Sequence, residues 1–160
     1  MVPDRPSGPI EGVKVLKLTR HEDQRGFLYE TYRLDELPAG LTPVMSYISY
    51  TRPGIARGPH EHTGQTDIFS LPGPGNFLLK LWDNRSESPT FGQFMSLTAG
   101  SDNPLTIVVP PGVIHGYKNI STEDGMVLNY PDRLFMGQGK KGPLDEVRHE
   151  DDPDSPYKMD

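Results

Sequence analysis

The sequence predicts an all-β protein with little helix. Runs rich in β-branched and aromatic residues recur at short intervals, and Gly, Pro, Asn and Asp separate them. The chain has 17 Gly and 17 Pro among 160 residues, which is too many for a helical bundle and indicates frequent turns. No stretch keeps a helical apolar period for three turns. We therefore expect a sandwich, barrel or jelly roll of eight or more short strands.

Four strands are expected in the first half of the chain. Residues 13–18 read VKVLKL, in which Val and Leu are interrupted by Lys, as in a half-buried strand. Residues 27–33 and 44–50 are rich in aromatic side chains mixed with Thr or Ser. Residues 66–71 place Ile, Phe and Leu between polar neighbours. Each run is short, and turn-forming residues follow it, so we expect strands rather than helices.

Four more strands are expected in the second half. Residues 76–82 and 105–109 are mainly apolar, as in strands buried on both faces. Residues 92–98 and 126–130 mix apolar, aromatic and polar side chains over a strand length. Pro-Gly and Gly-Pro pairs between the runs mark tight turns. The eight predicted strands, separated by tight turns, are consistent with one compact all-β domain.

The length and the net charge of the chain exclude some classes of function. A chain of 160 residues predicts one domain, residues 1–160, with a polar, acidic tail from about residue 136. We expect this tail either to wrap the β-structure or to fray, with its acidic residues as solvated surface. The 22 acidic and 16 basic residues give a net charge of −6, which disfavours nucleic-acid binding.

No apolar run is long enough to span a membrane, and the N-terminal residues lack a signal-peptide core. We expect a soluble, cytoplasmic protein.

The chain has no Cys, which excludes disulfides, thiolate metal sites and cysteine nucleophiles. Any metal must therefore be held by His and carboxylate ligands. The densest polar cluster is residues 56–67, which contains His60, Glu61 and His62. In an extended segment His60 and His62 point to one face and Glu61 to the other, so two imidazoles share one cavity wall.

A second polar cluster, residues 110–119, reads PPGVIHGYKN and places His115 just after a Pro-Gly turn. Three His residues and one acid from the two clusters match a metal-ligand set, and such N and O ligands suit Zn, Fe, Ni or Mn. The candidate metal ligands are His60, His62, Asp67 and His115. A divalent metal thus remains possible, and substrate contact is the alternative role for His62.

The two clusters resemble cupin motifs: P-x-G-x-x-H-x-x-x-N at residues 110–119 is similar to the second, and H-x-H with a downstream acid to the first. Cupins are small jelly-roll β-barrels, so the resemblance implies a single cupin domain. The segments DQRGFLYE, RGPH, DNRSESPTFG and PGVIHGY, in this order, resemble blocks of the dTDP-4-dehydrorhamnose 3,5-epimerase family. Together they span about two-thirds of the chain.

This resemblance implies a sugar-nucleotide epimerase or keto-isomerase that removes a proton next to the ketone of a 4-keto-6-deoxyhexose nucleotide. Such an isomerase needs a base, a proton donor on the other face, and a group that stabilises the enolate. The resemblance assigns His60 as the base and Tyr130 as the acid. It implies substrate-binding roles for Arg25, Glu30, Arg57, His62, Gln65 and His115. It also implies a homodimer that requires no cofactor.

Some positions depart from the family pattern. Asp67 stands near a position where the family has a Lys, and Met45 and Tyr47 stand where it has Gln and Asn. Single epimerisation, double epimerisation and keto-isomerisation all use the same enolate chemistry. Two further hypotheses are a metal-dependent cupin oxygenase or isomerase, and a non-catalytic cupin that binds a sugar nucleotide.

Overall fold

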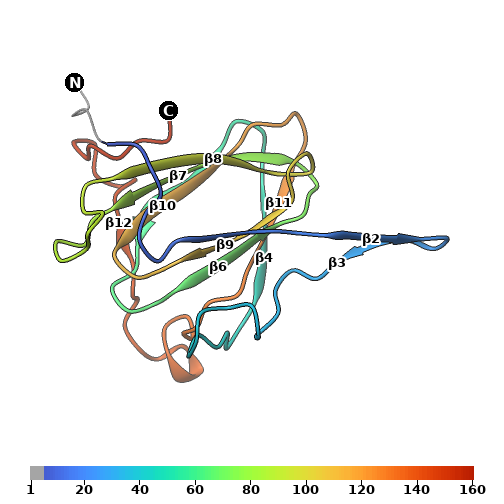
Figure 1. Ribbon diagram of the computed structural model, residues 1–160. Coiled ribbons are helices and arrows are strands. Elements are labelled where there is room, and N and C mark those ends of the chain that lie inside the picture. Colours follow the sequence, from blue (N-terminus) through green and yellow to red (C-terminus); the bar gives the residue numbers. More distant parts are fainter. Residues whose placement is uncertain (1–5) are drawn as a thin grey trace.

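The computed structural model describes residues 6–160, and almost every regular element in this range is a strand. One five-stranded antiparallel sheet has the order β1-β9-β6-β11-β4 (Figure 1). Its strands are β1 (Lys14–Lys17), β9 (Leu105–Val109), β6 (Asp67–Leu71), β11 (Gly125–Asn129) and β4 (Tyr47–Thr51). We call it the first sheet.

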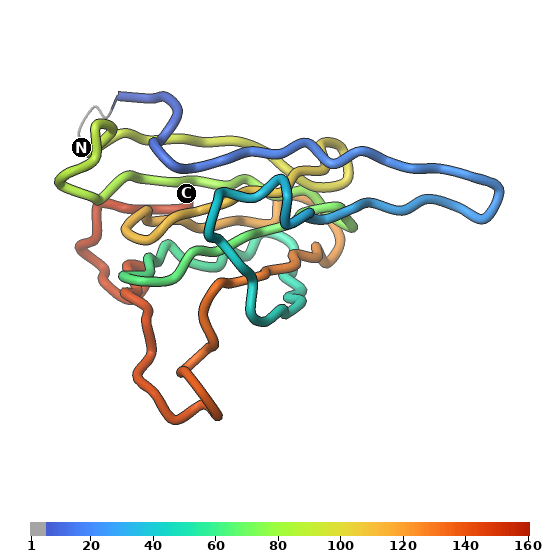
Figure 2. The backbone as a smooth tube through the Cα atoms, turned by 60° about the horizontal axis from the view of Figure 1, so that its bottom comes forward, coloured from blue at the N-terminus to red at the C-terminus, as the bar shows by residue number. Residues whose placement is uncertain are grey.

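A second five-stranded sheet has the order β12-β5-β10-β7-β8. Its strands are β12 (Val147–Arg148), β5 (Ala56–Glu61), β10 (Val113–Asn119), β7 (Asn76–Asp83) and β8 (Phe94–Gly100). The strands β2 (Arg20–Asp23) and β3 (Gly26–Tyr29) form a separate hairpin that extends away from both sheets (Figures 1 and 2). The only helical segment within residues 6–160 is a 3-10 turn, Gln138–Lys140.

The core lies between the two sheets, as expected for a β-sandwich. Phe69, Ile107 and Val127 of the first sheet pack in one cluster with Phe77 and Leu81 of the second. These five side chains are between 0% and 3% exposed. The prediction of an all-β, jelly-roll type of fold is confirmed, with two facing sheets as its layers.

The outer face of the second sheet is covered by the end of the chain. Trp82 and Ile114 point away from the main core and pack against Met159, with Tyr157 beside them. The C-terminal residues therefore bury a second apolar layer and cover the outer face of β10.

No helix in the part of the chain described is long and apolar enough to cross a membrane.

Some strand predictions need correction. β10 was not predicted as a strand, although its residues carry the second polar cluster. The run at 27–33 forms a strand only to Tyr29, and the run at 44–50 begins its strand at Tyr47. The segment between Tyr29 and Tyr47 leaves the sheet and crosses its outer face, where Leu37 packs on Ile68.

Asp83, at the end of β7, organises the turn that leads to β8. Its carboxylate accepts hydrogen bonds from Arg85 Nε at 2.8 Å and from the hydroxyls of Ser88 and Thr90 at 2.6 Å each. Burial alone would raise the pKa of Asp83, but these hydrogen bonds outweigh it and hold the pKa well below its usual range. The ionised carboxylate is thus the folded-state form.

Replacing this carboxylate should be costly. We expect Asp83→Ala to lower the free energy of unfolding by about 3 kcal/mol at pH 7, because Arg85, Ser88 and Thr90 lose their shared, buried acceptor. Asp35→Ala, which removes an exposed partner of Arg33, should cost less than about 1 kcal/mol. Urea denaturation followed by tryptophan fluorescence measures both.

The difference between wild type and Asp83→Ala should shrink as the pH falls below about 4, since a lowered folded-state pKa gives stability that is present above the unfolded pKa and lost below it. Equal costs for the two variants at pH 7 would contradict this role of Asp83.

Candidate active site

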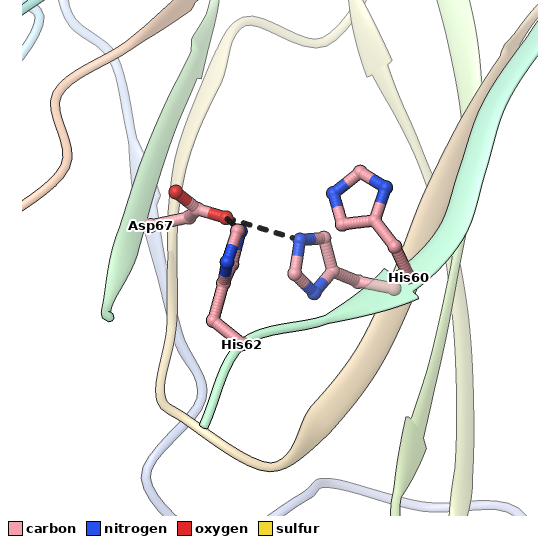
Figure 3. A group of neighbouring side chains, drawn as sticks. His60, His62 and Asp67 are labelled. Atoms are coloured by element: carbon pink, nitrogen blue, oxygen red, sulfur yellow. Dashed lines mark hydrogen bonds and ion pairs between the residues drawn. The ribbon is translucent and has the colours of Figure 1, made fainter. Parts of the chain in front are cut away.

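The candidate site lies between the two sheets at the ends of β5, β6 and β10. His60 and His115 are register partners on the antiparallel strands β5 and β10. His62 follows β5 by one residue, and Asp67 begins β6 in the opposite sheet. Figure 3 shows the imidazole of His62 against the carboxylate of Asp67, with the imidazole of His60 farther from that carboxylate. The structure therefore brings together the four residues that the two polar clusters suggested as metal ligands.

The sequence around Gly58 explains how β5 and β10 approach so closely. Gly58 has φ +79°, and a Cβ there would lie 2.7 Å from the carbonyl oxygen of His115. Only glycine fits this contact without moving a strand. The close approach places the ring centroids of His60 and His115 4.7 Å apart.

Asp67 is the centre of the polar network and is 1% exposed. Its Oδ2 lies 3.0 Å from His62 Nε2 and 3.2 Å from His115 Nε2. Its Oδ1 accepts hydrogen bonds from Gln65 Nε2 and Asn129 Nδ2, both at 2.9 Å. Burial raises the pKa of Asp67, but the interactions with the two imidazoles outweigh it and lower the pKa. The expectation that Asp67 lies near His60 and His62 agrees with this geometry.

The two imidazoles that contact Asp67 are also held at their other nitrogens. His115 Nδ1 donates to the carbonyl of Val113 at 2.9 Å, and His62 Nδ1 donates to the carbonyl of Asp145. Burial lowers the pKa of His62, but Asp67 and Asp145 outweigh it and raise the pKa to about 9. Both rings are consequently fixed in orientation, with Nε2 directed at the carboxylate.

His60 has a different environment. Its Nδ1 lies 3.7 Å from Glu146 and 3.8 Å from Glu150. Burial, followed by the repulsion of His115 and His62, lowers the pKa of His60 to about 3. His60 is therefore neutral at pH 7 and has an unprotonated nitrogen available to accept a proton.

The C-terminal segment wraps back onto the site through β12, which is one of its two expected courses, and the expectation that its acidic residues are solvated surface is wrong for Glu146, whose side chain is 14% exposed. Figure 2 shows this segment, in orange and red, looping out below the sheets and returning to them. The Asp145 carboxylate accepts hydrogen bonds from the backbone N–H groups of Thr63, Gly64 and Gln65 at 2.8–3.0 Å. These bonds attach the returning segment to the loop after β5.

Beside these residues lies a partly open cavity of about 800 Å³. Its wall includes His60 and His62 from β5 and the following loop, and it includes Met45 and Tyr47 from the region of β4. Three cationic side chains of the C-terminal segment also line it: Arg133, Lys140 and Arg148. An anionic ligand can thus be held in a protein whose net charge is −6.

Tyr47 is a site residue that sequence reasoning did not assign. Its hydroxyl accepts a hydrogen bond from Asn129 Nδ2 at 2.9 Å, and the same amide donates to Asp67. Burial raises the pKa of Tyr47 to about 12, so the phenol keeps its proton at neutral pH. The position was noted only because the related family has a polar residue there, which was the one available signal.

The structure does not bring Tyr130 to His60. Asn129 points into the space between the sheets, so the next residue points to the outer face of the first sheet. There the Tyr130 hydroxyl lies 2.9 Å from Thr31 Oγ1, and its ring packs on Tyr32 and Ile68. The expected position of Tyr130 beside the base is therefore corrected.

Three other predicted substrate contacts lie away from the cavity of their own chain. Arg25, at the tip of the β2–β3 hairpin, is 89% exposed and pairs with Asp23. Glu30 contacts Arg33 on the surface. Arg57 donates to Thr51 Oγ1 and to the carbonyl of Tyr50 instead of lining the cavity. Gln65, in contrast, lines the cavity and contacts both His62 and Asp67.

A two-sheet β fold with a His–Asp cluster beside a partly open cavity defines a cupin-like enzyme site. The sequence profile of the dTDP-4-dehydrorhamnose 3,5-epimerase family matches residues 7–139. The chain belongs to this family, as the motifs predicted. The predicted enzyme class, an isomerase, is confirmed with it.

Comparison with individual proteins supports the membership of this family. The chain is 38% identical to the "Probable low-salt glycan biosynthesis epimerase Agl13" of Haloferax volcanii over 79% of this chain and 81% of that protein. It is 30% identical to the dTDP-4-dehydrorhamnose 3,5-epimerase of Salmonella typhimurium over 70% of this chain and 64% of that protein. The crystal structure of a dTDP sugar isomerase from Desulfovibrio desulfuricans superposes with a TM-score of 0.79 at 26% identity, covering 94% and 92% of the two chains.

Proposed function

We propose that the protein removes a proton from the carbon next to the ketone of a dTDP-linked 4-keto-6-deoxyhexose and returns it to the opposite face. The observation that carries the proposal is the neutral imidazole of His60 on the wall of a partly open cavity. The family and the relatives with epimerase names supply the substrate class. Epimerisation and keto-isomerisation share this first step.

In the free protein, burial and the neighbouring imidazoles disfavour the charge that His60 would gain as a base, so we propose that negative charge in the complex with substrate compensates for them. The carboxylates of Glu146 and Glu150 face its Nδ1 at 3.7 and 3.8 Å. A bound diphosphate adds further negative charge near the ring, and this raises the pKa of His60 toward the working pH. We propose that the carboxylates of Glu146 and Glu150 orient the ring of His60.

The proton on the opposite face requires a donor that stays protonated. The Tyr47 hydroxyl lines the cavity and is held by Asn129, whereas the Tyr130 hydroxyl contacts Thr31 on the outer face. We therefore assign the donor role to Tyr47. A phenol with a raised pKa keeps its proton until an enolate draws it away.

The diphosphate needs cationic partners inside the cavity. Arg133 and Lys140 line it, and guanidinium groups form paired hydrogen bonds with phosphate oxygens. These side chains belong to the C-terminal segment, so binding of the nucleotide would also hold this segment closed over the sugar. Gln65 and His62 line the same cavity and remain proposed substrate contacts.

Loss of the base should abolish proton exchange. We expect His60→Ala to lower the rate of deuterium incorporation next to the ketone by at least about 100-fold, since a general base contributes roughly 10²- to 10⁴-fold. NMR of a dTDP-4-keto-6-deoxyhexose incubated with the protein in D₂O measures the rate. The control is His149→Gln, because His149 contacts Glu61 on the other face of β5.

The same assay separates an enzyme from a binding protein. A non-catalytic cupin would be stabilised against heat by the nucleotide sugar but would incorporate no deuterium. The absence of exchange with wild-type protein would refute the proposed function.

Two tyrosine variants test the donor. Tyr47→Phe should allow exchange at the carbon that His60 deprotonates but lower epimer formation by at least about tenfold, because the proton can no longer be delivered from the other face. Tyr130→Phe should leave both rates within about twofold. Product analysis by NMR gives the two rates, and the reverse ranking would exclude Tyr47 as the donor.

We also propose that the protein is a homodimer formed through the outer face of the first sheet. Phe27 and Leu28 on the hairpin are 57% and 58% exposed, and Ile48 and Tyr50 on β4 are 56% and 58% exposed. Together they form an apolar surface of the kind that a partner covers. A second copy in this position would also bring the hairpin residue Arg25 to another molecule, where it can serve as a substrate contact.

The dimer can be tested by one charged substitution. Wild-type protein should sediment at twice the chain mass of 17.8 kDa, and Leu28→Asp should shift it toward the single-chain mass, because a buried unpaired charge weakens the interface. Phe91→Asp, at a similarly exposed position beside β8, should leave the dimer intact. A wild-type protein that sediments as a monomer would overturn the proposal.

A further inference from the structure

One carboxylate of the C-terminal segment holds the loop that follows β5. The two oxygens of Asp145 accept hydrogen bonds from three successive backbone N–H groups: Thr63 at 2.8 Å, Gly64 at 2.9 Å and Gln65 at 3.0 Å. The Thr63 hydroxyl donates to the same carboxylate at 2.6 Å. Successive N–H groups in a turn form a concave site for an anion, and a bound carboxylate holds that conformation. The loop is therefore shaped by a residue 82 positions beyond Thr63.

The residues beside these N–H groups include two of the proposed substrate contacts. His62 Nδ1 donates to the backbone carbonyl of Asp145, so one residue holds both the imidazole and the loop. The backbone N–H of Gln65 donates to the Asp145 carboxylate, and its side chain contacts His62 and Asp67. His62 and Gln65 both line the cavity. Without Asp145, both side chains would lose a contact that fixes their position.

Asp145 also determines where the chain returns to the second sheet. Glu146 follows it directly, and β12 comes next and pairs with β5, with Arg148 opposite His60. Glu146 thereby comes to lie 3.7 Å from His60 Nδ1. Because the two acids are neighbours in the chain, a shift of Asp145 would move the Glu146 carboxylate relative to His60.

A second contact attaches the same loop to the C-terminal segment. Arg133 Nε donates to the carbonyl of Gly64 at 2.8 Å, whereas the N–H of Gly64 donates to Asp145. Residues 133 and 145 are the two ends of the portion that loops out below the sheets (Figure 2). Both ends of this portion, which lines the cavity, are therefore attached to the loop that carries the substrate contacts.

We propose that Asp145 is a positioning residue that holds the substrate contacts His62 and Gln65 in place. Through the backbone it also places Glu146 beside His60. Both carboxylate oxygens of Asp145 are occupied by donors of the loop, so Asp145 acts through its neighbours. The inference rests on the proposed function for the identity of the substrate, whereas the hold of Asp145 on the loop can be measured without a substrate.

Amide hydrogen exchange measures that hold. In wild-type protein the N–H groups of Thr63, Gly64 and Gln65 should be protected from exchange. In Asp145→Asn an NH₂ group, which cannot accept, replaces one carboxylate oxygen. At least one of the three N–H groups should then exchange at least about tenfold faster, because a lost hydrogen bond to a charged group costs that factor or more. Unprotected N–H groups in wild-type protein would refute the hold of Asp145 on the loop, whether or not the variant folds.

Asp132→Asn is the matched control. Asp132 also accepts a hydrogen bond from a backbone N–H next to this loop, that of Thr66 at 2.8 Å. This is one bond to one oxygen, so the amide oxygen of Asn can keep it. Exchange at residues 63–65 should therefore stay as in wild type. Equal acceleration by both variants would show that Asp145 has no special place.

Steady-state kinetics with a dTDP-4-keto-6-deoxyhexose in D₂O tests the positioning role. Asp145→Asn should raise KM at least about tenfold, because the substrate contacts lose their fixed orientation. Asp132→Asn should keep KM within about twofold. A smaller folded fraction would lower kcat and leave KM unchanged, and that result would reduce Asp145 to a structural residue. Wild-type protein without any deuterium exchange refutes the proposed function, and amide exchange then still decides whether Asp145 holds the loop.

Discussion

The buried carboxylate of Asp67 is the constraint on which the site depends. A negative charge that is 1% exposed must be matched by donors or cations, because water cannot solvate it. The partners come from both sheets: His115 from β10, His62 and Gln65 from the loop after β5, and Asn129 from β11. Satisfying this one group therefore fixes the relative positions of the strands that carry the site.

The same constraint shapes the reactive residues. His62 and His115 are turned toward Asp67, so His60 is left as the imidazole with carboxylates only at the longer distances of 3.7 and 3.8 Å. Asn129 extends the network from Asp67 to the Tyr47 hydroxyl. The proposed base, His60, and the proposed donor, Tyr47, therefore line one cavity, and Tyr47 is connected to the buried charge of Asp67 through Asn129. The C-terminal segment completes the wall through Asp145 and supplies cations for an anionic ligand.

Local sequence patterns predicted much of the candidate site. Alternation placed His60 and His62 on one wall, and the Pro-Gly turn before His115 marked the second cluster. Other features escaped it for identifiable reasons. Gly58-Pro59 reads as a turn although it lies within β5, and β10 lacks alternation because most of its residues are buried on both faces. Tyr130 was misplaced because a shift of one residue in a strand reverses the face.

Contacts between residues far apart in the sequence could not be predicted from local sequence pattern. Asp145 meets Thr63 across 82 positions, and no periodicity links the two. Acidic residues in a polar tail are ordinarily solvated, so nothing local distinguishes Asp145, Glu146 and Glu150 from their exposed neighbours. Their role follows from the path of the C-terminal segment back to β5, which is a property of the whole fold.

If His60 is the base, it must face the reacting carbon of a nucleotide-linked sugar inside this cavity. The most direct measurement is the distance between a His60 ring nitrogen and the hexose in a crystal structure with a dTDP-hexose bound. We predict a carbon next to the ketone position within about 3–3.5 Å of that nitrogen, with the diphosphate against Arg133 and Lys140. A hexose bound outside the cavity, with His60 contacting only protein, would contradict it.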